Sequence, residues 1–115
     1  MAETFTNATL ALPTQAITTT NAQVYTCPTT ASSAIVIGCN ISNIDGTNSV
    51  DVDFGLDIDG GSTIRYYVKD SALAAGNSVN PVLGRAVIGV SQVLRARGSA
   101  ASDAEVVLSI MEITA

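Results

Sequence analysis

Strict alternation of apolar and polar residues along positions 50–58 is the feature that most constrains the fold of this 115-residue chain. Every second position is apolar, and the positions between them are aspartate or glycine. The apolar members are Val50, Val52, Phe54, Leu56 and Ile58, and the others are Asp51, Asp53, Gly55 and Asp57. Successive side chains of a β-strand point to opposite faces, so this pattern predicts a strand with one face in a core and the other in water.

The same period recurs on both sides of this segment, and the connecting residues suggest how the three strands pair. Asp45-Gly46 is typical of a type I′ hairpin turn, which would bring the apolar faces of the first two strands together. A three-residue loop over 60–62 would set Phe54 opposite Val68. Because opposed residues share a face, both turns agree with the apolar pattern. We therefore expect residues 35–69 to form a three-stranded antiparallel meander.

The outer two strands of this meander are expected to contribute to the same core. The first strand would place four residues on the core face: Ile35, Ile37, Cys39 and Ile41. In the third strand, Tyr66 would face the core, and Tyr67 would lie outside and cover Gly55. Two opposite-charge pairs on the outer face, Asp57 with Arg65 and Asp53 with Lys69, support this register.

Weaker patterns elsewhere complete the expected fold. Short strands are predicted near 9–12, 24–26 and 87–90. Seven or eight short antiparallel strands in all predict an all-β fold, a single β-sandwich domain over residues 1–115 of the jelly-roll or immunoglobulin-like kind. Residues 1–30, rich in threonine and alanine, are the segment most suited to an extended N-terminal arm.

The end of the chain predicts a further hairpin, with 93–97 opposite 103–107 and Arg97 paired with Asp103. The final strand is apolar on both faces, which requires a central position in the sandwich or a covering subunit. Its faces carry Val106, Leu108 and Ile110 on one side and Val107, Met111 and Ile113 on the other. The candidate residues for a subunit interface are Leu10, Leu12, Val107, Met111 and Ile113.

Charge is scarce, and its sign excludes two classes of partner. Only 13% of the residues are charged, against about 25% in an ordinary soluble domain, so self-association or incorporation into a larger assembly is expected. The net charge of −5 speaks against nucleic acid and anionic membranes as partners. No apolar run approaches the roughly 20 residues that span a bilayer. The segment 1–7 has no signal-peptide pattern, so we expect synthesis in the cytoplasm without export through a cleaved signal.

Catalytic and metal chemistry has little support. The chain has no histidine, which excludes Ser-His-Asp and Cys-His arrangements and His-bearing metal sites. Carboxylates are then the only common catalytic groups that remain, and four of them form an acidic row: Asp51, Asp53, Asp57 and Asp59. We expect this row to be a solvated outer face of its strand. Cys27 and Cys39 lack metal-ligand spacing, and a reducing compartment favours free thiols. We therefore assign no catalytic, cofactor-binding or metal residue, and expect a protein that is not an enzyme.

Several features in order along the chain resemble small virion structural proteins of tailed bacteriophages. They are the Val24-Tyr25-Thr26-Cys27-Pro28 strand, the Asp-rich hairpin, the Leu73-x-x-Gly76-x-Ser78 and Leu83-Gly84 segments, and the closing Met111-Glu112-Ile113-Thr114. The resemblance implies a non-enzymatic, self-associating β-domain of a virus particle. We expect a capsid decoration (cement) protein that works as a homotrimer docked on the major capsid protein, with a tail or fibre component as an alternative. A carbohydrate- or receptor-binding module is the main alternative, although three tyrosines and no tryptophan give it little support.

Overall fold

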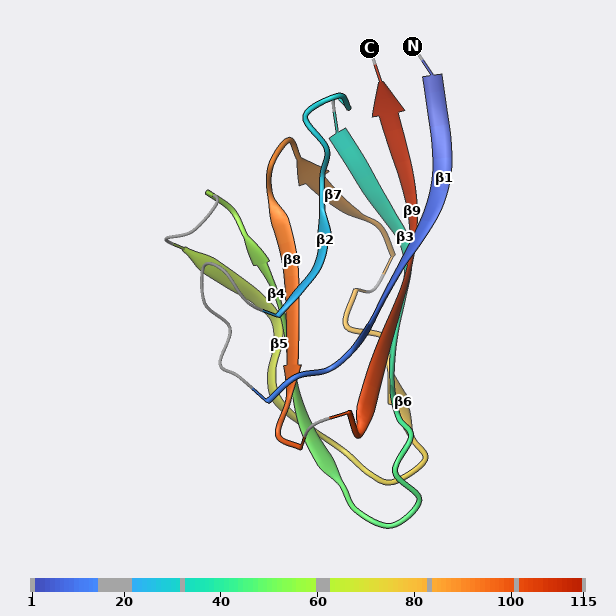
Figure 1. Cartoon of the computed structure of the whole chain (residues 1–115), viewed down its shortest axis with the longest axis vertical. Helices are drawn as coiled ribbons and strands as arrows, with labels where there is room; N and C mark the ends of the chain where they lie inside the picture. Colours follow the sequence, from blue (N-terminus) through green and yellow to red (C-terminus); the bar gives the residue numbers. More distant parts are fainter. Residues whose placement is uncertain are drawn as a thin grey trace.

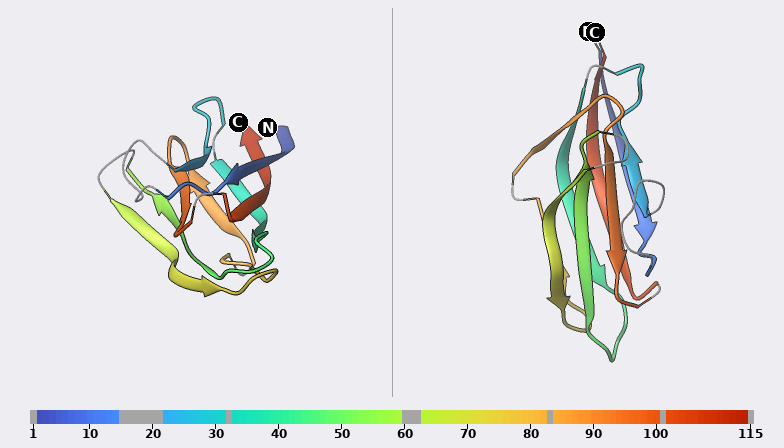
Figure 2. Two further views of the ribbon diagram at one scale, coloured as in Figure 1. Left: turned by 60° about the horizontal axis from the view of Figure 1, so that its bottom comes forward. Right: turned by 90° about the vertical axis from the view of Figure 1, so that its left-hand side faces the viewer.

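The structure is a computed structural model that describes residues 2–14, 22–31, 33–59, 63–82, 84–100 and 102–114. These residues form nine strands and no helix, arranged as two antiparallel sheets that face each other (Figures 1 and 2). The all-β sandwich predicted from the sequence is therefore confirmed, with one or two more strands than expected.

Each sheet collects strands from distant parts of the sequence. Sheet A has the order β1-β9-β3-β6, with β7 also paired to β3, and comprises β1 (Ala2–Ala11), β9 (Ala104–Thr114), β3 (Ser33–Asn43), β6 (Ser78–Val79) and β7 (Ala86–Gly89). Sheet B has the order β2-β8-β4-β5 and comprises β2 (Gln23–Thr26), β8 (Val93–Gly98), β4 (Val50–Asp57) and β5 (Ile64–Leu73). The long final strand β9 thus lies between β1 and β3.

The core between the two sheets is almost entirely aliphatic. Phe54 is its largest fully buried side chain, and its ring lies 5.6 Å from that of the half-buried Tyr67. Fully buried aliphatic residues come from both sheets and include Val36, Ile41, Val52, Leu94, Val106, Leu108 and Ile110. The even-numbered face of β9 therefore packs in the core, as the alternation in the sequence indicated.

The predicted hairpin between the second and third strands of the meander is present. β4 and β5 are antiparallel neighbours, and Phe54 lies opposite Val68. The register then shifts by one residue, so that Gly55 lies opposite Tyr66. This irregularity reverses the predicted faces of the two tyrosines: Tyr67 packs on Phe54 in the core, and Tyr66 is the exposed ring beside Gly55. The loop over 60–62 lies outside the described residues.

Replacing Gly55 by alanine is expected to destabilise the protein by about 1–3 kcal/mol, because the added methyl group has no room. A Cβ atom there would lie 2.9 Å from Cγ2 of Ile64 and 3.1 Å from the backbone oxygen of Arg65. Urea denaturation would measure the loss. Gly46→Ala is the matched control, since a Cβ at Gly46 meets no atom within 4 Å. Equal stability of the two variants would contradict the crowding at Gly55.

The predicted hairpin between the first two strands is wrong, because β3 lies in sheet A and β4 in sheet B. The connection uses a side chain instead of a type I′ turn. The Asp45 carboxylate accepts hydrogen bonds from the backbone N–H groups of Thr47 (2.8 Å) and Asn48 (3.2 Å). Neither Asp45 nor Gly46 has the positive φ that a type I′ turn requires. The segment therefore carries the chain from one sheet to the other.

The predicted closing hairpin is also wrong. β8 pairs with β2 and β4 in sheet B, whereas β9 pairs with β1 and β3 in sheet A. The apolar residues on the inner face of β8 meet those on the inner face of β9 across the core, so both strands bury the expected residues without being hydrogen-bonded to each other. The arginines of β8 consequently face acidic residues of β4 and not those of β9: Arg95 binds Asp57, and Arg97 lies near Asp53.

Candidate assembly surface

The acidic row of the sequence does not form a solvated face throughout. Asp53 and Asp57 are 2% and 0% exposed. Oδ2 of Asp57 accepts hydrogen bonds from Nη2 (3.1 Å) and Nε (3.2 Å) of the buried Arg95. The expectation of a solvated row is therefore wrong at these two positions, whereas Asp51 and Asp59 are exposed.

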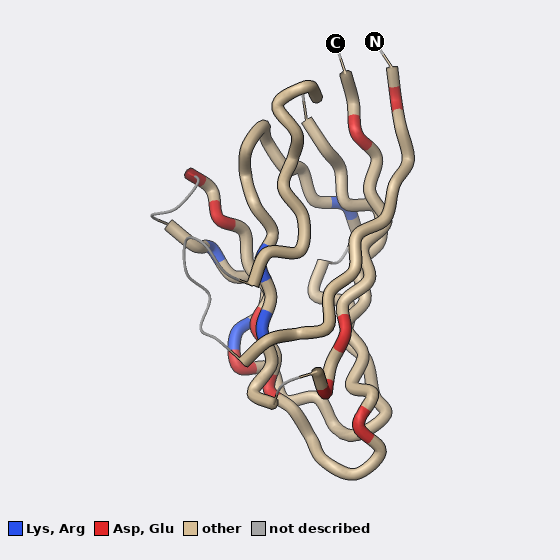
Figure 3. Tube along the Cα trace, viewed as in Figure 1, with Lys and Arg blue, Asp and Glu red and all other residues tan. Residues whose placement is uncertain are grey.

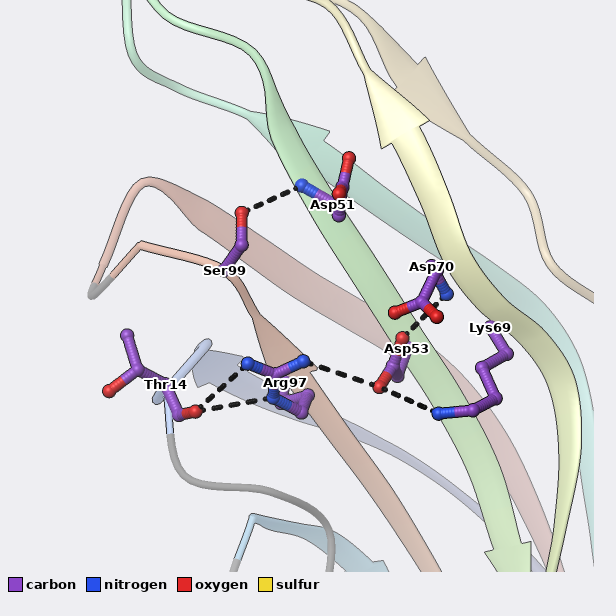
Figure 4. Close-up of polar contacts among 7 residues, drawn as sticks. All are labelled: Thr14, Asp51, Asp53, Lys69, Asp70, Arg97 and Ser99. Atoms are coloured by element: carbon purple, nitrogen blue, oxygen red, sulfur yellow. Dashed lines mark hydrogen bonds and ion pairs between the residues drawn. The ribbon is translucent and has the colours of Figure 1, made fainter.

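Asp53 organises a small polar network, shown in Figure 4. Its Oδ2 lies 3.5 Å from Nη1 of Arg97 and 3.9 Å from Nζ of Lys69, and its Oδ1 accepts a 2.7 Å hydrogen bond from the backbone N–H of Asp70. Arg97 also donates two hydrogen bonds to the backbone oxygen of Thr14. These contacts connect β4, β5 and β8 with one another and with Thr14, which follows β1.

The two cysteines offer no reactive group in the folded protein. Cys27 and Cys39 are free and buried. Burial raises the pKa of the Cys39 thiol to about 12, so the nucleophilic thiolate is scarce at neutral pH. Among the described residues, no group of three or more histidine, cysteine or acidic side chains could hold a metal ion. None of the described segments is a helix long and apolar enough to cross a membrane.

Charge is distributed unequally between the two sheets (Figure 3). Four of the five basic residues lie on strands of sheet B: Arg65, Lys69, Arg95 and Arg97. The solvent side of sheet A is different. By alternation its described strands carry mostly small, polar uncharged or apolar residues, with Glu3 and Glu105 as exceptions. The charge deficit of the sequence is therefore concentrated on one face of the molecule.

A line of four apolar residues crosses this outer face of sheet A from edge to edge. Phe5 lies opposite Met111, Met111 opposite Ile35, and Ile35 opposite Val87. We call these four residues the apolar row. Its two end members, Phe5 and Val87, are 68% and 67% exposed. An uncovered apolar line across a face with little charge is typical of an interaction surface.

A β-bulge in β3 creates the centre of the apolar row. The pairing with β9 shifts between Val36 and Gly38, so the faces of β3 are exchanged across Ile37. Ala34 and Val36 are buried before the bulge, and Ile35 points to the outer face. The prediction that Ile35 and Ile37 face the core is therefore wrong. A bulge of this kind re-aims side chains without interrupting the sheet.

A hollow of about 380 Å³ lies within this face. It is lined by Phe5 and Met111 at one side, by Ile35 and Ile37, and by Arg85, which precedes β7. Ile37 is 41% exposed. Arg85 is exposed and makes no ion pair within the described part of the chain. The hollow thus combines apolar walls with one cation.

The interface residues expected from the sequence are divided by the structure. Val107 is 48% exposed on the outer face of sheet A, and the half-buried Met111 and Ile113 share that face by alternation. Leu10 is half-buried and packs against the core, and Leu12 is fully buried within it. Leu12 therefore lies in the core of the single copy and not on this surface.

Three members of this surface were not predicted from the sequence: Phe5, Ile35 and Val87. Phe5 stands in a segment expected to be an arm, where no period-two signal supported a strand. Val87 belongs to the segment Val87-Ile88-Gly89-Val90, which is too short to show which of its side chains point outward. The one sign in the sequence that Phe5 could be exposed was its position as a single large apolar residue among the polar residues of segment 3–7.

Comparison with known proteins shows the fold. No family model matches the chain, and no curated protein sequence resembles it. Among solved structures, it is similar to a chain of the acidic stable capsid structure of Helicobacter pylori bacteriophage KHP30, with 13% identity, a TM-score of 0.52, and 97% of this chain and 87% of the other covered. A chain from the disulfide-linked pili of Bacillus endospore appendages has 14% identity, a TM-score of 0.50, and coverages of 99% and 88%.

Proposed function

We propose that this protein is a non-enzymatic structural protein of a virus particle, a capsid decoration protein that self-associates as a homotrimer and docks on the shell. The observation that carries the proposal is the uncovered apolar row on the outer face of sheet A. A free monomer would keep Phe5 and Val87 in water, whereas a neighbouring subunit would cover them. The partners are then further copies of the chain and the major capsid protein.

The similar structures support this reading. The similarity to a chain in the KHP30 capsid structure extends over nearly the whole of both chains, so a domain of this size and fold occurs in a phage capsid. The second similar chain comes from disulfide-linked pili. Both similar chains therefore come from assemblies, a capsid and pili.

The proposed location of the protein is the virion, after its synthesis in the cytoplasm of the host. Nucleic acid and membrane surfaces are poor partners for a chain of net charge −5. A tail or fibre component has the same physical requirements as a capsid component. A carbohydrate-binding module is less well supported, because Tyr66 is the one large exposed tyrosine ring in the described residues.

Sedimentation equilibrium of the purified protein tests the self-association. We expect a particle of three times the 11.7 kDa chain mass at micromolar concentration, and a stable interface should bury on the order of 1,000 Å² or more. Co-sedimentation with shells that lack the protein tests docking. A monomer at all accessible concentrations would disprove self-association, and density for the chain in tails alone would exclude the capsid position.

A further inference from the structure

We propose that Phe5 of one copy inserts into the hollow of a second copy, between Ile35, Ile37 and Met111. This inference rests on the proposed function, because it names the contact by which copies associate. Phe5 is the most exposed of the large apolar side chains among the described residues. It stands on β1 at the edge of sheet A, where a neighbour can reach it without rearrangement of the fold.

The hollow has the size and chemistry that a phenyl ring requires. Its volume is about 380 Å³, and an apolar cavity of about 150 Å³ already holds benzene. Its apolar walls are the side chains of Ile35, Ile37 and Met111, together with Phe5 of the receiving copy itself. Methionine sulfur packs favourably against aromatic rings, and the guanidinium of Arg85 can lie over a ring face. Each of these features favours an aromatic occupant.

The charges on the two sides of the contact are opposite. Glu3 lies two residues before Phe5 on the same face of β1, about 7 Å away along the strand. It has no ion pair within the described residues, and neither has Arg85 beside the hollow. When Phe5 of one copy enters the hollow of the next, Glu3 arrives near Arg85 of that copy. The donor side is thus acidic and the acceptor side basic, which orients the two copies.

The edge of β1 is open to such an approach. Long edge strands are usually protected by lysine, proline or bulges, and β5 at the edge of sheet B has both charges and register shifts: Arg65, Lys69 and Asp70. In contrast, β1 contains no lysine or proline over its ten residues. A neighbouring copy can therefore lie directly against this edge while it receives Phe5.

We place the contact head to tail, with Phe5 of each copy in the hollow of the next, because the proposed trimer requires an arrangement of this kind. Contacts of this heterologous kind generate closed rings when the rotation between copies closes, and filaments when it does not. A ring of three copies agrees with the proposed trimer and uses every Phe5 and every hollow.

Mixing two association-deficient variants tests this directly. Phe5→Ala removes the donor ring and leaves the hollow of its own copy apolar, with Ile35, Ile37 and Met111 unchanged, whereas Ile37→Asp places a charge in the hollow. Both positions are exposed enough to leave the fold intact. We expect each variant alone to be monomeric in sedimentation, and an equimolar mixture to form a dimer with twice the chain mass, because Phe5 of the Ile37→Asp copy meets the apolar hollow of the Phe5→Ala copy. Ile44→Asp, at a 55% exposed position in the β3–β4 connection, is the control and should associate like the wild type.

The outcomes separate the contact from the function. If either single variant associates like the wild type, or if the mixture stays monomeric, the proposed contact is wrong while a self-associating protein remains. If the wild type itself is monomeric, the proposed self-association fails as well. A charge exchange provides a second measurement: Glu3→Arg and Arg85→Glu should each weaken association roughly two- to fivefold, and the double variant should restore it. No restoration in a folded double variant would overturn the pairing.

Discussion

Replacing Phe54 by alanine is expected to lower the free energy of unfolding by about 3–5 kcal/mol, a large part of the stability of an ordinary domain. Phe54 is fully buried at the centre of β4, between the two sheets, and its ring packs on Tyr67. The substitution removes the burial of a phenyl ring, leaves a cavity in an aliphatic core, and deletes an aromatic pair. The neighbouring strands are held in two sheets and can close the cavity only in part.

The chain contains a matched control, because its other phenylalanine is exposed. Phe5→Ala makes the same chemical change at a position 68% exposed to water, and should alter the stability of a single copy by no more than about 0.5 kcal/mol. Urea denaturation of both variants, at a concentration too low for self-association, measures the difference. Similar losses for Phe54→Ala and Phe5→Ala would mean that Phe54 is not at the centre of the core.

Replacing Asp57 by alanine is expected to cost a similar amount, about 3–5 kcal/mol, for an electrostatic reason. Asp57 and Arg95 are 0% and 3% exposed, and their side chains are joined through Oδ2 of the carboxylate. Without Asp57, the guanidinium of Arg95 keeps its charge in a site that water scarcely reaches. The loss reflects a buried charge that has lost the Asp57 carboxylate, and it is larger than the contribution of the pair itself.

Two further variants distinguish this cause from a general sensitivity of β4. Asp51→Ala removes an exposed aspartate of the same strand and should change the stability by no more than about 0.5 kcal/mol. The double variant Asp57→Leu/Arg95→Leu replaces the pair by apolar side chains and should recover most of the loss. Thermal and urea denaturation measure all three. A double variant as unstable as Asp57→Ala would refute the electrostatic explanation.

The sequence predicted the strands of the fold better than their partners. The alternation at 50–58 identified β4, and the pairing of Phe54 with Val68 in the β4–β5 hairpin was correct. The β3–β4 hairpin was wrong for a general reason. In a sandwich, the inner faces of both sheets point to one core, so apolar residues of β3 and β4 are buried whether the strands are neighbours in one sheet or face each other across the core. Matching faces cannot separate these arrangements.

The candidate surface, too, could be predicted only in part. The apolar alternation on β9 correctly indicated that Met111 and Ile113 lie on a second face, away from the core. The contribution of β3 was not predicted, because a bulge at Ile37 exchanges the faces of that strand. Gly38, directly after Ile37, is the one residue of the segment whose type is typical of a bulge. The apolar row and the hollow depend on four strands that are distant in sequence. Their alignment is a property of the sheet order and not of any one segment.

The pairing of β1 with β9 brings Ala2 opposite Thr114, so the two ends of the chain leave the sandwich side by side (Figure 1). A short linker between them would close the backbone into a circle, and the β3–β4 connection at the opposite end of the molecule would then be a suitable place for new termini. Such a permuted chain would keep every strand pair. It would also carry fused cargo at the end far from Phe5, whereas cargo attached next to Ala2 or Thr114 would crowd the apolar row.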